Sequence, residues 1–114
     1  MPQGISLLDK LGAMVGKLDN TDPAWVVFIT DHIDYVKRSS TVIGITDAIR
    51  DRYRHKFEHF MRDQSCNRQL IWVAKMINDL ETYSDFTLKQ VVMIPDTSTI
   101  TDLYRKYRTS RNND

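Results

Sequence analysis

Apolar residues near the start of the chain recur every three or four positions. Between Ile5 and Leu18 this spacing predicts a short amphipathic helix, with Ser6 available as its N-cap. Gly12 and Gly16 fall inside it and cost about 1 kcal/mol each relative to alanine. We therefore expect this helix to need a packing partner.

A different pattern follows the turn-forming residues 20–23. The run from Trp25 to Ile29 is β-branched and aromatic, which predicts a buried strand. Ile33, Tyr35 and residues 42–45 extend the apolar pattern, and a polar interruption falls at 38–40. One long strand, a hairpin and a linking arm are all compatible with residues 25–45.

The centre of the chain has the clearest helical periodicity. A helix is predicted to open at Thr46-Asp47 and to carry one apolar stripe as far as Met61. A polar turn at 63–67 ends it, and Asn67 is placed to cap a second helix that begins near Leu70. Because residues 70–77 are apolar nearly all round, we expect the second helix to be the most buried element.

The last third of the chain alternates again. Residues 91–95 predict a short strand that Pro95 must end. Ser98 or Thr99 is then expected to cap a final helix, with Asp102 in its first turn and a frayed tail beyond Arg108. The predicted class is α+β.

Composition restricts the range of functions. The 114 residues suit one domain, and a net charge of +1 gives no reason to expect a protein dominated by nucleic acid or by an anionic membrane. Cys66 is the only cysteine, so no internal disulfide can form, and no apolar run approaches the roughly 20 residues that cross a bilayer. We expect a soluble protein made in a cytoplasm.

One string resembles catalytic chemistry. His55, Glu58 and His59 match H-x-x-E-H, in which two histidines one helical turn apart bind zinc and the glutamate serves as base. A further downstream ligand is needed, and the only later glutamate is Glu81, in a predicted loop. Cys66 has no histidine close in sequence. We therefore predict no catalytic residue, no metal site, no cofactor and no small-molecule substrate.

Basic and aromatic residues suggest binding surfaces. Basic side chains on the central helix are diluted by Asp51 and Glu58, so we expect no nucleic-acid contact there. The basic C-terminal segment predicts a docking tail for a protein, and Trp25 is either core or an interface anchor. The candidate partner-binding residues are Trp25, Arg105, Lys106, Tyr107 and Arg108.

The order of features between residues 53 and 95 resembles the LysM-like module of baseplate wedge proteins from contractile-tailed bacteriophages. In that family a Tyr-Arg start, a helix, a polar turn, a helix with Leu-x-Trp that ends at an asparagine, and a strand that ends in Ile-Pro follow one another. The corresponding core and motif residues here are Tyr53, Phe57, Leu70, Trp72, Asn78, Ile94 and Pro95.

The resemblance implies a β-α-α-β core with an N-terminal amphipathic helix and a C-terminal basic helix. Residues 1–22 would be an N-terminal arm, 23–96 the core with its strand region, and 97–114 the C-terminal helix and tail. The chain would be a structural virion protein of the tail baseplate that binds other tail subunits, and it would form a homo-oligomer if its assembly is symmetric.

Two alternatives remain. Glycan-binding LysM domains hold N-acetylglucosamine chains in loops that this chain replaces with residues 63–67 and 88–90, which favours a structural use of the fold over peptidoglycan binding. A small helical nucleic-acid-binding protein is the second alternative, with Arg105, Lys106 and Arg108 as its contacts.

Overall fold

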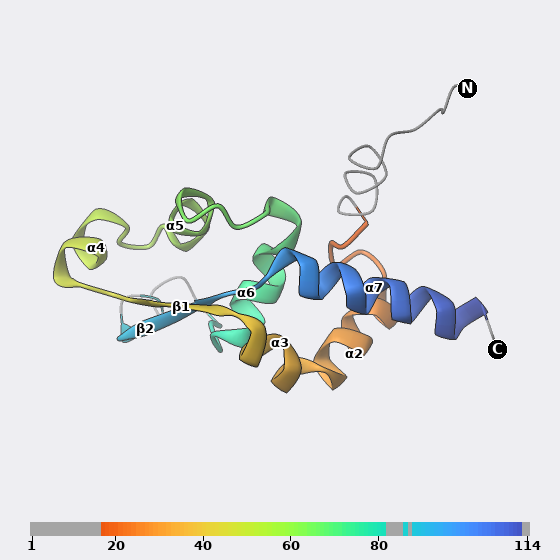
Figure 1. Ribbon diagram of the computed structural model, residues 1–114. Coiled ribbons are helices and arrows are strands. Elements are labelled where there is room, and N and C mark those ends of the chain that lie inside the picture. The colour runs from red at the N-terminus through yellow and green to blue at the C-terminus, as the bar shows by residue number, and fades with distance from the viewer. Residues whose placement is uncertain (1–16, 82–85, 87, 113–114) are drawn as a thin grey trace, which may run out of the picture.

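A computed structural model describes residues 17–81, 86 and 88–112 of the chain (Figure 1). Within these ranges it contains six α-helices, one 3-10 helix and a two-stranded sheet, so the α+β prediction is confirmed. The elements in order are α2 (Pro23–Asp31), α3 (Ile33–Ser39), β1 (Thr41–Gly44), α4 (Asp47–Arg52), α5 (Phe57–Asp63), η1 (Arg68–Leu70), α6 (Ile71–Ile77), β2 (Val91–Ile94) and α7 (Thr97–Asn112).

The two strands are antiparallel, and α4, α5 and α6 lie between them in the sequence. Their register pairs Thr41 with Ile94 and Gly44 with Val91. Val92 and Ile94 are buried on one face of the sheet, and the predicted strand that ends at Pro95 is confirmed. Residues 42–44 lie in β1, in agreement with the extended structure considered for them in the sequence.

The predicted strand at residues 25–29 is wrong, because this segment lies in α2. Pro23 occupies the first turn, and the Asp22 carboxylate accepts a hydrogen bond from the Ala24 N–H, so strong helix-start signals outweigh the β-propensity of the run. Trp25 and Ile29, four residues apart, are both buried on the inner side of this helix. Residues 33 and 35 are helical as well, in α3.

The single helix predicted from Thr46 to Met61 is two helices. Thr46 caps α4 as predicted, since its hydroxyl accepts from the Ile49 N–H, but α4 ends at Arg52. His55 has a φ of 58°, which no α-helix accommodates, and α5 starts at Phe57. Tyr53 and Phe57, on either side of the break, are both buried in the core, where they are 6% and 1% exposed.

The second central helix begins in two steps. The Asn67 side chain accepts from the Gln69 N–H and caps η1, which leads directly into α6. Val73, Ala74 and Ile77 of α6 are buried, and none of its seven residues is exposed, in agreement with the prediction of a deeply buried helix.

The last helix starts earlier and runs further than predicted. It begins at Thr97, and the Asp96 carboxylate accepts hydrogen bonds from the Thr99 N–H and from the Ser98 and Thr99 hydroxyls. These hydrogen bonds lower the pKa of Asp96, with that from Ser98 the largest cause. Asp96 therefore replaces Ser98 and Thr99 as the cap. Asp102 lies beyond the first turn, and the helix continues to Asn112 where fraying was expected.

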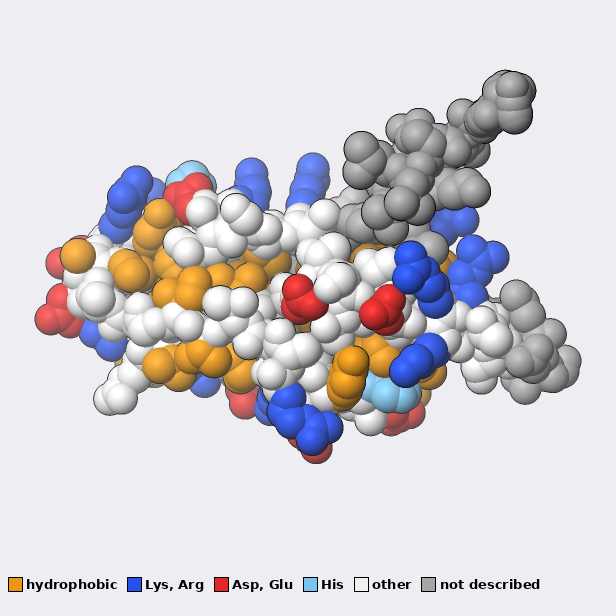
Figure 2. All heavy atoms as spheres, in the orientation of Figure 1, with side chains coloured by type: hydrophobic (Ala, Val, Ile, Leu, Met, Phe, Trp, Pro, Cys, Tyr) orange, Lys and Arg blue, Asp and Glu red, His pale blue; other side chains and the backbone are white. Residues whose placement is uncertain are grey.

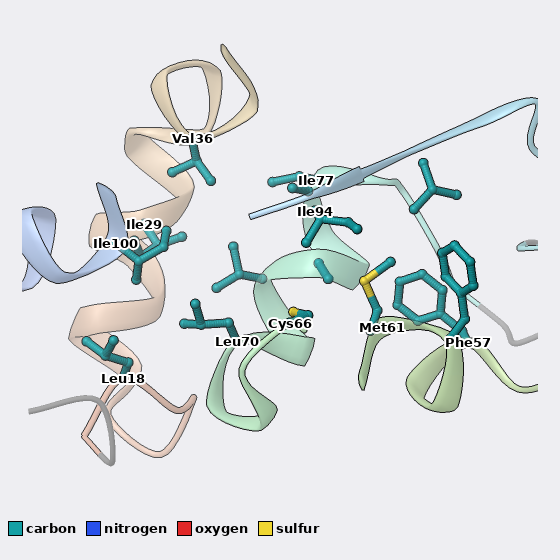
Figure 3. Close-up of a cluster of buried hydrophobic side chains, with 14 of the residues drawn as sticks. Leu18, Ile29, Val36, Phe57, Met61, Cys66, Leu70, Ile77, Ile94 and Ile100 are labelled. Atoms are coloured by element: carbon teal, nitrogen blue, oxygen red, sulfur yellow. The ribbon is translucent and has the colours of Figure 1, made fainter. Parts of the chain in front are cut away.

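A continuous hydrophobic core joins the helices to the sheet. Figure 3 shows Leu18, Ile29, Val36 and Ile100 at one end of it, Met61 and Phe57 at the other, and Ile77 and Ile94 between them. Because Ile100, Leu103 and Tyr107 of α7 are part of this core, the C-terminal helix packs against the same body as residues 23–96. The predicted N-terminal helix lies outside the described residues, except for Lys17 and Leu18, which are not helical. No helix in the described ranges has the length and apolar character to span a membrane.

Candidate functional site

An open groove of about 530 Å³ lies between the start of α2, α5 and the η1-α6 segment. Its lining includes the indole ring of a tryptophan, side-chain amides, and acidic and basic side chains. The lining residues are Asp19, Asn20, Glu58, Arg68, Gln69, Ile71, Trp72 and Lys75. A groove with one aromatic face and many hydrogen-bonding groups is suited to a polar ligand.

Two tryptophans hold one wall of the groove in place. The Nε1–H groups of Trp25 and Trp72 both donate to the Leu18 carbonyl oxygen, at 3.2 and 2.9 Å. Trp25 lies in α2 and Trp72 in α6, so this single carbonyl fixes the loop before α2 to a helix more than 50 residues away in sequence. The other wall carries an ion pair between Lys75 Nζ and Glu58 Oε1 at 2.9 Å.

The H-x-x-E-H residues do not converge. His55 is exposed at the break between α4 and α5, and Glu58 pairs with Lys75 in the groove. His59 Nε2 lies 3.6 Å from Asp63 Oδ2, an oxygen that also accepts the Tyr53 hydroxyl at 2.6 Å. This hydrogen bond to Asp63 raises the pKa of Tyr53. No cluster of three or more His, Cys, Asp or Glu suited to a metal ion occurs among the described residues.

Cys66 is a core residue. It is 7% exposed, and burial raises the pKa of its thiol to about 11. Because the thiolate is the nucleophile, its population at neutral pH is very small in this environment.

The motif residues of the LysM-like resemblance form contacts across the core. Leu70, Ile94 and Pro95 are buried, and Trp72 is half-buried along the groove. Asn78 is 5% exposed and connects α6 to β2. Its Nδ2 donates to the carbonyl oxygens of Ala74 and Met93 at 2.7 and 2.8 Å, and its Oδ1 accepts from the Met93 N–H at 2.7 Å.

The predicted partner-binding residues divide into two groups. Trp25 is fully buried, which agrees with the first of the two roles considered for it, and Tyr107 is 5% exposed with its hydroxyl donating to Asp22 at 2.6 Å, so both side chains lie in the core of this structure. Arg105, Lys106 and Arg108 lie on the exposed side of α7, where Arg105 pairs with Asp102 at 3.1 Å.

Apolar side chains on the outer face of the sheet were missed by the sequence interpretation. Val42 and Val91 are 59% and 53% exposed, and Leu88 before β2 is 80% exposed. Figure 2 shows two groups of hydrophobic side chains on the part of the surface where the strands lie, separated by uncharged surface. Because residues 91–94 are all apolar, their sequence does not distinguish the exposed face from the buried one, and only the pairing with residues 41–44 and the packing of the helices locate it.

Comparisons with protein-family models, with curated protein sequences and with solved structures give no match to this chain.

Proposed function

We propose that the chain is a structural subunit of a phage tail baseplate, in which a LysM-like unit formed by β1, α4, α5, α6 and β2 binds neighbouring tail subunits. The observation that carries the proposal is the connection made by Asn78. The resemblance rests on an asparagine that ends a helix and on a strand that ends in Ile-Pro, and in this structure Asn78 binds β2 one residue before that Ile-Pro pair.

The order of elements supports the same proposal. β1 is followed by α4, α5 and α6, and β2 then pairs with β1 in antiparallel fashion, with α6 in contact with β2; the helix expected first in a β-α-α-β unit is here divided into α4 and α5. This is the order expected for a LysM-like core. The helices α2, α3 and α7 would then be additions that extend the core toward neighbouring subunits.

The surface chemistry supports binding to proteins. The exposed valines of the sheet form an apolar face, and exposed apolar patches bordered by polar residues are typical of interaction sites. Arg105, Lys106 and Arg108 offer a separate basic surface on α7 to an acidic partner. In this proposal the chain is made in the host cytoplasm and remains in the virion tail.

The decisive experiment examines particles. Virions encoded by the same genome are purified, and mass spectrometry measures whether the chain is present in a fixed ratio to the tail proteins. The proposal expects a constant ratio in tailed particles and incomplete tails by electron microscopy when the gene is deleted. Fully infectious particles assembled without the chain would refute it.

Peptidoglycan binding is a second candidate, and the groove beside Trp72 favours it. An indole face next to amide and carboxylate groups is suited to a sugar ring with its hydroxyls. Titration with N-acetylglucosamine oligomers would then change tryptophan fluorescence in a saturable way, and Trp72→Phe would abolish the change. The baseplate proposal expects no saturable change in tryptophan fluorescence for the wild-type chain or for Trp72→Phe.

A further inference from the structure

One edge of β1 is paired with β2, and none of the residues that the structure describes pairs with the other edge. The Ile45 N–H donates to the Gln90 carbonyl oxygen at 2.8 Å, which identifies residues 41, 43 and 45 as those whose main-chain groups point toward β2. Because this direction alternates along a strand, the N–H and C=O groups of Val42 and Gly44 point away from β2. Four main-chain groups therefore line the free edge.

The opposite edge of the sheet is occupied at Met93. The outward N–H and C=O groups of Met93 in β2 are both bound by the Asn78 side chain. Natural proteins protect free edges with charged residues, prolines or a covering element. The four residues of β1, Thr-Val-Ile-Gly, include neither charge nor proline, so β1 is the accessible edge.

We propose that β1 pairs with β1 of a second copy of this chain, antiparallel about a two-fold axis at Ile43, to form a four-stranded sheet. In this register Val42 of each copy faces Gly44 of the other, and each such pair exchanges two main-chain hydrogen bonds. The outward groups lie two residues apart and symmetrically about Ile43, so the edge is complementary to itself, as a two-fold interface requires.

The side chains on the outer face fit the same register. A Cβ atom placed on Gly44 would have no neighbour within 4 Å, so the space above this glycine is open. Val91 stands beside this space, directly across from Gly44 on β2. Val42 of the second copy would stand beside Gly44 on the side away from Val91, where no side chain obstructs it.

The charges at the two ends of β1 select the antiparallel direction. Arg38 precedes the strand and is exposed, and Asp47 follows it with a side chain that is 98% exposed. Arg38 lies near the end of α3, and Asp47, which also pairs with Arg50 at 2.8 Å, lies at the start of α4, so the antiparallel direction brings the Arg38 end of each copy toward the Asp47 end of the other. Parallel addition of the same strand would place like charges side by side. The inference holds whether or not the chain is a virion protein.

Sedimentation equilibrium of the full chain between about 5 and 500 µM tests this pairing. Four hydrogen bonds and a small apolar contact give weak association, so we expect the average mass to rise from 13.4 kDa toward twice that value within this range. Val42→Pro removes an edge N–H that makes no hydrogen bond to β2 and should weaken association at least tenfold. The matched control Val42→Thr keeps the N–H and the branched side chain, and its dissociation constant should stay within about threefold of wild type.

A charge exchange provides a second test that does not alter the strand. Arg38→Asp and Asp47→Arg should each weaken association severalfold, and the double variant should recover most of the loss. Circular dichroism verifies that each variant is folded, and if Val42→Pro fails to fold, the charge exchange decides. A wild-type chain that stays monomeric to the highest concentration, or a folded Val42→Pro that associates like wild type, would overturn the proposal. In the first case the edge would be left for a strand from a different protein.

Discussion

Replacing Asn78 with alanine should be among the most destabilising single substitutions in this protein. The side chain makes three hydrogen bonds, to the carbonyl oxygens of Ala74 and Met93 and to the Met93 N–H, at 2.7 to 2.8 Å. Because Asn78 is 5% exposed, water cannot readily replace these contacts. Asn78→Ala would therefore leave both main-chain groups of Met93 without a partner.

The expected magnitude follows from the number of bonds. At a net value of roughly 0.5–1.5 kcal/mol per hydrogen bond, the loss amounts to about 3 kcal/mol of the free energy of unfolding. For a domain of this size that corresponds to a fall in melting temperature of roughly 10–15 °C. Urea denaturation followed by circular dichroism measures the change. A loss below about 0.5 kcal/mol would refute the role assigned to Asn78.

Asn78→Asp provides a sharper form of the same test. The carboxylate keeps the acceptor for the Met93 N–H but replaces the donor with a charge that faces two carbonyl oxygens, so it should cost more than alanine at neutral pH. Burial and these oxygens raise the pKa of the new carboxyl in the folded state. Protonation therefore favours folding, and part of the lost stability should return as the pH falls through this raised pKa.

The matched control is Asn67→Asp, the same chemical change at another position. The Asn67 side chain only accepts a hydrogen bond, from the Gln69 N–H at 2.9 Å, and aspartate accepts equally well at a helix start. Its stability should stay within about 0.5 kcal/mol of wild type. Equal losses at both positions would contradict the geometry described for Asn78.

Other substitutions test separate contacts. Asp96→Ala should cost about 1 kcal/mol by removing the cap of α7. Because the hydroxyls that donate to Asp96 lower its pKa in the folded state, the stability it contributes is present above the ordinary carboxyl pKa and is lost as the pH falls through the lowered pKa. The free energies of unfolding of wild type and variant should therefore converge as both proteins are titrated with acid. Trp72→Phe should cost about 1 kcal/mol, because only Trp25 would still donate to the Leu18 carbonyl, and chemical denaturation of both proteins measures this. Cys66 should resist iodoacetamide at neutral pH in the native protein and react once urea unfolds it; rapid native labelling would contradict the burial that raises its pKa to about 11.

The sequence by itself determined the elements whose signals are local. Thr46 begins a helix, Pro95 ends a strand, and the apolar character of residues 70–77 places that helix in the core, because each depends only on neighbouring residues. The α+β class followed from these elements.

Only the tertiary structure decided whether some apolar segments form a strand or a helix, and where a helix is interrupted. Residues 25–29 suit a strand by composition, whereas the Asp22-Pro23 start signal is local and favours a helix, and the packing of Trp25 against Tyr104 and Tyr107 of α7 fixes the helix in the core. The break at His55, whose φ is 58°, divides a segment whose apolar spacing is that of one continuous helix, so the spacing alone did not predict it.

The tertiary structure also decided which residues form the surfaces that we propose to bind partners. Tyr107 looked like part of a basic tail until its hydroxyl was found on Asp22, 85 residues away in sequence. The difference between the two edges of the sheet depends on Asn78, which binds the outward groups of Met93 in β2 through a contact across 15 residues that no local pattern contains. The exposure of a side chain and the pairing of a strand depend on which residues lie nearby in space, and these residues cannot be identified from their separation in the sequence.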